Sequence, residues 1–178
     1  MSVHREIVGI YEGIRHYPIV YYYHSRHAYR SLPYTFRMLG GVTTALRWGL
    51  PKDRPGGQAP WLPTLITGLT HITTHLDERF LGQSIGESPA SVPYQDFEAA
   101  YSHGEDGSDP WIARFMRITS YMGEMVRLEQ KPAAEEAYER YVEWLTFAHR
   151  NEVFVKNCAK DLGYDLEDFD EIPGNRLF

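Results

Sequence analysis

The stretch Leu62-Pro-Thr-Leu-Ile-Thr-Gly-Leu-Thr-His-Ile-Thr-Thr-His-Leu-Asp-Glu-Arg-Phe80 is the most regular part of the chain. Its apolar side chains recur at intervals of three and four residues, which is the repeat of one face of an α-helix. They are Leu62, Leu65, Ile66, Leu69, Ile72, Leu76 and Phe80. The spacing predicts a helix of about five turns that buries this face against other helices.

Shorter helical patterns lie on both sides of this stretch. They predict helices over residues 3–14, 36–46, 110–125 and 132–163, and at most short helices over residues 19–29 and 94–101. Asp109 followed by Pro110 is typical of a helix start, with the carboxylate as N-cap and proline at the first helical position. Gly163 is expected to end the last helix. No segment alternates as a half-buried strand would, so we expect an all-α fold.

The expected architecture is an irregular bundle of about five or six helices with a long central loop and an acidic C-terminal tail. The expected divisions are a single helical domain over residues 1–163, made of an aromatic and basic helical part (1–50), a linker (51–60) and a helical core (61–163), followed by the tail (164–178). Gly40-Gly41 interrupts the pattern of the 36–46 helix. This pair is expected either to loosen the helix or to let another backbone approach closely.

Residues 16–37, called here the aromatic–basic segment, contain six tyrosines, three histidines and three arginines but no carboxylate. Tyrosine and arginine are enriched at the centres of protein interfaces, because each combines a large contact area with a polar end. We therefore expect the segment to contact another protein. The predicted contact residues are Tyr21, Tyr22, Tyr23, Arg26, Tyr29, Arg30, Tyr34 and Arg37, together with Phe169 and Phe178 of the tail.

Composition excludes several classes of protein. The net charge of −6 argues against a surface shaped for nucleic acid, since phosphate binding needs an excess of basic residues. Cys158 is the only cysteine, so no internal disulfide can form, and we expect an inert thiol.

The N-terminus lacks the apolar core of a secretory signal. No window is apolar enough for a membrane span, so the chain is expected to be soluble, with a peripheral place on a membrane complex as one option.

His71, His75 and Glu78 follow one another at intervals of four and three residues, so they share one face of the helix predicted over 62–80. Such a face can present ligands to Zn or Fe, and His149 could complete the site if the last helix packs beside it. The competing interpretation is a polar stripe facing solvent or a partner. These residues lie opposite the apolar face, and the chain has no Glu-x-x-His pair of the kind that metal-binding bundles use. We therefore expect no cofactor.

A third interpretation places an anionic small molecule among the basic residues of the aromatic–basic segment. The residues that would hold it are His24, Arg26, His27 and Arg30. Neither a glycine-rich phosphate loop nor a paired acid accompanies them, which favours the interface over a ligand pocket.

The first part of the chain resembles the LYR-motif proteins, which are small helical accessory subunits and assembly factors of mitochondrial respiratory complexes. The residues that carry the resemblance are Ile10-Tyr11-Glu12, Arg15, Pro18 and Phe36-Arg37, so it is confined to residues 1–40. In the family a basic residue at the position of Glu12 helps to engage an acidic acyl carrier protein, and this chain carries the opposite charge there. The resemblance implies a helical, non-catalytic subunit with aromatic and arginine contacts, imported without a conspicuous cleaved presequence.

Together these features predict a non-enzymatic accessory or structural subunit of a large multi-protein assembly, whose partners are the other protein subunits. A mitochondrial respiratory-chain or ATP synthase complex is the expected host, with a cytoplasmic location as the alternative. The alternative function is a helical metal-binding protein or metalloenzyme that uses His71, His75 and Glu78.

Overall fold

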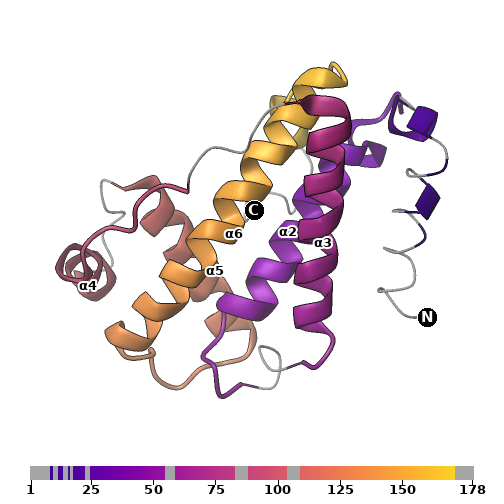
Figure 1. Cartoon of the computed structure of the whole chain (residues 1–178). Helices are drawn as coiled ribbons and strands as arrows, with labels where there is room; N and C mark the ends of the chain where they lie inside the picture. Colours follow the sequence, from indigo (N-terminus) through magenta and orange to yellow (C-terminus); the bar gives the residue numbers. More distant parts are fainter. Residues whose placement is uncertain are drawn as a thin grey trace.

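Figure 1 shows the computed structural model of the chain, which describes residues 9, 12, 13, 16, 18–22, 25–54, 59–82, 88–103 and 109–170. These residues form helices and turns with no strand among them, so the expected all-α fold is confirmed. The elements are η1 (Pro18–Tyr22), η2 (Ala28–Arg30), α2 (Leu32–Trp48), α3 (Leu62–Leu76), η3 (Asp77–Leu81), α4 (Tyr94–His103), α5 (Pro110–Met125), α6 (Ala134–Asp161) and α7 (Glu167–Asp170). Both η1 and η2 are 3-10 helices, and η3 is a π-helix. None of the helices that these residues form is both long and apolar enough to cross a lipid bilayer.

The long helix α6 is the element around which the others are arranged. It packs most extensively along α2 and also contacts α4, α5 and η3. In Figure 1, α2 and α3 lie to the right of α6, and α4 lies to its left. The rings of Phe36 and Phe154 meet at 5.0 Å, while the backbone carbonyl of Trp48 accepts a hydrogen bond from Arg140. The start of α2 therefore lies beside the end of α6, and the two helices run antiparallel.

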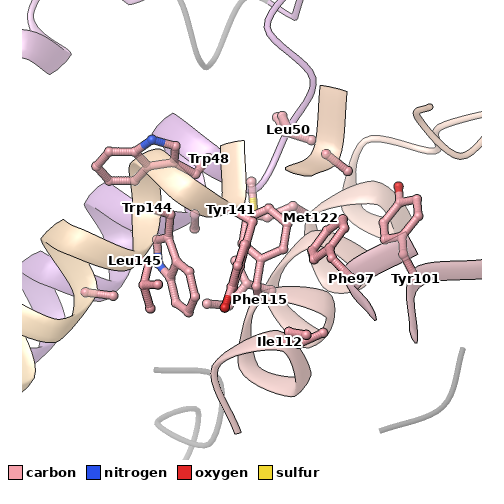
Figure 2. Packing of buried hydrophobic residues seen from close by; sticks show 14 residues of the cluster. Trp48, Leu50, Phe97, Tyr101, Ile112, Phe115, Met122, Tyr141, Trp144 and Leu145 are labelled. Carbon is pink, nitrogen blue, oxygen red and sulfur yellow. The ribbon is translucent and has the colours of Figure 1, made fainter. Parts of the chain in front are cut away.

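Buried side chains form two clusters along α6. The first joins the N-terminal half of α6 to α4, α5 and the end of α2, and Figure 2 shows the rings of Phe115, Tyr141 and Trp144 within it. The second joins the C-terminal half of α6 to α3, Tyr21 and Phe36. Burying one large apolar side chain stabilises a fold by roughly 1.5–3 kcal/mol. Because α6 contributes side chains to both clusters, it connects the two parts of the hydrophobic core.

The start of α5 and the end of α6 have the capping residues that the sequence predicts. The Asp109 carboxylate accepts hydrogen bonds from the backbone N–H groups of Trp111 (2.7 Å) and Ile112 (3.1 Å), which caps α5. Gly163 follows α6 with φ +70°, a conformation that glycine adopts without a steric penalty. The helix predicted over 62–80 is present as α3 and η3, with the last turn widened into a π-helix.

Gly40-Gly41 does not loosen α2, which continues without a break from Leu32 to Trp48. A Cβ placed on Gly40 would lie 2.7 Å from Cγ of Asn151, closer than non-bonded carbon atoms approach. The absence of a side chain at Gly40 therefore leaves room for the Asn151 side chain of α6, so the close neighbour is a side chain and not the backbone expected for the pair.

Other expected elements differ from the structure or fall outside it. The short helix predicted over 19–29 is replaced by η1 and η2, with Ser25, Arg26 and His27 as non-helical residues ahead of η2. Most of the helix predicted over 3–14 lies outside the described residues. So do residues 55–58 of the linker, 83–87 and 104–108 of the central loop, and 171–178 of the tail.

Candidate functional site

Tyr21 attaches the aromatic–basic segment to the body of the protein. Its side chain is fully buried, and its ring stacks on Phe80 with centroids 4.2 Å apart and planes 5° from parallel. Its hydroxyl donates a hydrogen bond of 3.0 Å to the carboxylate of Asp161 at the end of α6. Burial raises the pKa of this hydroxyl above the ordinary tyrosine value. The prediction that Tyr21 lies on a contact surface was therefore wrong, because the structure places it in the core.

The neighbouring aromatic and basic side chains of the segment face outward. Tyr22 and Tyr29 are 53% and 48% exposed, and Arg26 and Arg30 are also exposed. The guanidinium of Arg30 lies 5.3 Å from the centre of the Tyr29 ring, and the His27 ring stacks on the same tyrosine at 5.3 Å. The segment therefore presents cationic groups and aromatic rings on the surface of the protein, and their contact with another protein stays a prediction.

Two further predicted contact residues, Tyr34 and Arg37 on α2, are half-buried. Tyr34 packs its ring at 5.8 Å from that of Phe169, so part of its surface is used within the chain. Tyr23 and Phe178 lie outside the described residues, as does His24 of the predicted anion pocket.

The beginning of the acidic tail packs on the protein's own core. Phe169 is fully buried, in ring contact with Tyr34 and with Tyr164 at 6.4 Å. The Tyr164 hydroxyl accepts a hydrogen bond from the Ser25 backbone N–H (2.9 Å) and donates one to the Ser25 carbonyl (3.1 Å). The prediction of Phe169 as an anchor in another protein was therefore wrong, because the aromatic side chain completes the core of this one.

The structure does not gather the candidate metal ligands. His71 and Glu78 are exposed and His75 is half-buried, which agrees with their predicted place on the polar face of α3 and η3. His149 instead packs against α5, with its ring 6.0 Å from that of Trp111. Among the residues that the structure describes, no three His, Cys, Asp or Glu side chains lie close enough to hold a metal ion.

Asp77 is a buried acid that the sequence interpretation passed over. It begins the π-helix and is 6% exposed. Burial raises the pKa of its carboxyl group, and the positive charge of Arg150 on α6 acts in the opposite direction. Arg150 itself donates a hydrogen bond to the Thr74 hydroxyl. Asp77 comes four residues after Thr73 and eight after Leu69, both of which are buried, and that spacing is the signal that could have identified it.

A cavity of about 830 Å³ opens where five segments meet, namely the ends of α2 and α4, the second half of α5, the residues between α5 and α6, and the start of α6. The lining residues are Gly49, Tyr101, Met116, Arg117, Thr119, Ser120, Tyr121, Gly123, Glu124, Arg127, Leu128, Gln130, Lys131, Pro132 and Arg140. Thirteen of these residues lie between Met116 and Arg140, and Gly49 and Tyr101 come from earlier in the chain. The sequence did not predict the site because these residues form no recognised ligand-binding motif.

The cations of the cavity are held in different ways. Arg140 is buried, donates a 2.5 Å hydrogen bond to the Trp48 carbonyl and forms an ion pair of 3.3 Å with Glu136. Lys131 places its ammonium group 3.7 Å from the centre of the Tyr101 ring and donates to the Tyr101 carbonyl. Burial lowers the pKa of Lys131 from its ordinary value. Arg117 and Arg127 are exposed at the cavity wall.

Comparison of the chain with protein-family models, curated proteins and solved structures gave no match. The resemblance to LYR-motif proteins therefore stays a prediction, and the function is inferred from the surfaces described above.

Proposed function

We propose that this chain is a non-enzymatic accessory subunit of a larger protein assembly, and that its aromatic–basic segment docks onto an acidic surface of a neighbouring subunit. The observation that carries the proposal is the change of exposure along the segment. Tyr21 is held in the core, while Tyr22, Arg26, Tyr29 and Arg30 remain on the surface. A segment held by a buried side chain loses less conformational entropy on binding than an unattached one.

Charge favours an acidic partner. The aromatic–basic segment contains no carboxylate, although the whole chain carries a net charge of −6. Opposite charges on two surfaces steer their encounter and fix the orientation in which they dock.

The resemblance of residues 1–40 to LYR-motif proteins supports the choice of host. We propose a mitochondrial respiratory-chain or ATP synthase complex as the assembly and the mitochondrion as the location. Glu12 is exposed, and it carries a negative charge where the family has a basic residue. An acidic acyl carrier protein is therefore not the partner that we propose.

The test is to isolate the tagged full-length chain from its own cells and to separate the material by native electrophoresis. The wild type should migrate in an assembly of fixed composition, in which mass spectrometry identifies the other subunits. Tyr22→Ala and the double variant Arg26→Ala/Arg30→Ala should migrate as the free chain, since a central anchor contributes roughly 2 kcal/mol or more. Trp61→Ala is the control, because Trp61 is 50% exposed on another element.

Two results would contradict this proposal. One is a wild-type chain that migrates alone, and the other is an assembly that retains the Tyr22 and arginine variants. An assembly without respiratory-chain or ATP synthase subunits would contradict only the proposed host.

We propose that this function needs no metal or other cofactor. Elemental analysis of protein purified without chelators should give well under one equivalent of Zn or Fe per chain. A stoichiometric metal that is lost in His75→Ala would instead support the metal-binding alternative, because a site with defined ligand geometry depends on each ligand.

A further inference from the structure

We propose that the cavity between α4, α5 and α6 is a binding site for a small phosphorylated molecule, whose phosphate is held by Arg117, Arg127 and Lys131. This site is separate from the aromatic–basic segment and goes beyond the docking function proposed above. Its volume of about 830 Å³ lies within the range of small-molecule sites, which is roughly 300–1,000 Å³.

The balance of charge in the cavity is opposite to that of the protein. Its lining contains the cations Arg117, Arg127, Lys131 and Arg140 but only one carboxylate, that of Glu124, in a chain with a net charge of −6. Arg140 is neutralised by its ion pair with Glu136, which lies just outside the lining. With Glu136 counted, four cations face two carboxylates around the cavity, and this excess of positive charge favours an anion.

The conformation of Arg127 is the second observation. Its φ is +53°, the only positive value at a non-glycine residue within the described ranges. The backbone N–H of Arg127 donates to the Glu124 carbonyl (3.1 Å), and that of Leu128 donates to the Gly123 carbonyl (2.9 Å). This pattern is the Schellman motif at the end of α5, in which the left-handed position is usually glycine. An arginine held there at a cost in stability points to a role for its side chain outside folding.

At the end of α6 the same motif has glycine, the usual residue, in the left-handed position. Gly163 has φ +70° and donates to the Lys160 carbonyl (3.3 Å), and Tyr164 donates to the Ala159 carbonyl (2.8 Å). The two helices thus end in the same motif, one with glycine beside solvent and one with arginine beside the cavity. Exchanging arginine and glycine at these two positions, Arg127 and Gly163, therefore provides a matched control for the role of the arginine side chain.

The chemistry of the cations points to phosphate. Arginine presents N–H groups in a planar fork that matches two phosphate oxygens, and lysine adds a compact charge. Lys131 is held in place by the ring and the carbonyl of Tyr101. Tyr121 is 42% exposed in the same lining, and with Met116 it offers an aromatic and an apolar surface to the rest of the ligand. A phosphate ester with a planar or apolar body fits these features.

The test is calorimetric titration of the full-length chain at low salt with inorganic pyrophosphate, ATP and citrate. Both phosphate compounds should bind more tightly than citrate. Arg127→Gly and Lys131→Gln should each weaken ATP binding at least ten-fold, whereas Arg79→Gln, which removes an exposed cation on η3, should leave it unchanged. A stronger binding of ATP than of pyrophosphate that is lost in Tyr121→Ala would identify the surface that holds the body of the ligand.

Thermal unfolding separates the binding role of Arg127 from a structural one. Arg127→Gly should unfold at the same temperature as the wild type or at a higher one, while losing affinity for ATP. Gly163→Arg should unfold at a lower temperature and keep the affinity. The proposal is overturned if neither phosphate compound binds, if citrate binds as well as they do, or if Arg127→Gly binds ATP like the wild type. None of these results bears on docking through Tyr22 and Arg26.

Discussion

The hydroxyl of Tyr21 donates a 3.0 Å hydrogen bond to the carboxylate of Asp161, a residue 140 positions further along the chain. This contact joins the aromatic–basic segment to the end of the longest helix, and the stacking of Tyr21 on Phe80 joins it to η3. Its neighbour Tyr22 is 53% exposed. Two adjacent tyrosines therefore have different roles, one in stability and one on the proposed docking surface.

We first predict that substitutions of Tyr21 and Tyr22 lower the free energy of unfolding by different amounts in urea denaturation. Tyr21→Ala should lower the free energy of unfolding by about 3–5 kcal/mol, because it leaves a cavity against Phe80. Tyr21→Phe should cost about 1 kcal/mol, the typical contribution of one hydrogen bond. Tyr22→Ala should cost less, about 0.5–1.5 kcal/mol, because the half-exposed ring loses only its edge-on contacts with Tyr21 (5.0 Å) and Phe80 (5.8 Å). Equal losses in Tyr21→Ala and Tyr22→Ala would show that Tyr22 is also needed for folding.

The second prediction concerns Phe169 and the start of the tail. Phe169→Ala should lower the free energy of unfolding by about 3–5 kcal/mol, since the ring is fully buried against Tyr34 and Tyr164. Deleting residues 165–178 should lower the thermal midpoint for the same reason. Ile19→Ala is the control, because its side chain is 78% exposed. A tail deletion that leaves the midpoint unchanged would mean that Phe169 does not contribute to this core.

The third prediction tests the close approach of α2 and α6. Gly40→Ala should cost about 1–3 kcal/mol, because the new methyl group would overlap the side chain of Asn151. Asn151→Ala removes the overlapping atoms, so the double variant should be more stable than the sum of the two single losses predicts. Losses that simply add in the double variant would indicate that Gly40 and Asn151 do not interact.

The fourth prediction concerns the pH dependence of stability through Cys158. Burial raises the pKa of this thiol from 9.0 to about 12. Above pH 9 the unfolded chain releases the thiol proton and the folded chain keeps it, so the stability of the folded state falls as the pH rises. The contribution of one such group is about 1.4 kcal/mol per pH unit.

Urea denaturation of the wild type and of Cys158→Ala between pH 8 and pH 11 measures this contribution. Tyr141 titrates in both proteins, so its contribution cancels in the difference. Tyr21 hydrogen-bonds the thiol, so the difference measures the thiol together with its coupling to Tyr21. The advantage of the wild type over the variant should shrink as the pH rises above 9. A difference that does not change with pH would show that the thiol is not shielded from water as its burial implies.

The local features of the fold could be predicted from the sequence because neighbouring residues produce them. The apolar repeat of residues 62–80 predicts α3, since positions three and four apart share a helix face. Asp109 and Gly163 mark helix ends because their own backbone and side-chain chemistry satisfies the terminal hydrogen-bonding groups. The polar face that carries His71 and Glu78 follows from the same repeat.

The tertiary structure alone decided which members of the aromatic–basic segment are buried. Tyr21, Tyr22 and Tyr29 are chemically identical, and their burial depends on whether distant residues such as Phe80 and Asp161 lie beside them. The same applies to Phe169, since one of its two ring partners, Tyr34, comes from the other end of the chain. Long-range packing of this kind has no local repeat, so no sequence pattern distinguishes these residues.

The cavity, too, exists only in the tertiary structure. Arg117, Arg127 and Lys131 are ordinary charged residues in the sequence, and they come together because the end of α5 turns back toward α6 beside Tyr101. The left-handed conformation of Arg127 accompanies backbone hydrogen bonds from Arg127 to Glu124 and from Leu128 to Gly123, which any residue except proline could donate. The sequence by itself thus determined where helices form and how they begin and end, because those features depend on neighbouring residues. Which faces meet, and what the cavity between them contains, depended on contacts between residues far apart in the chain.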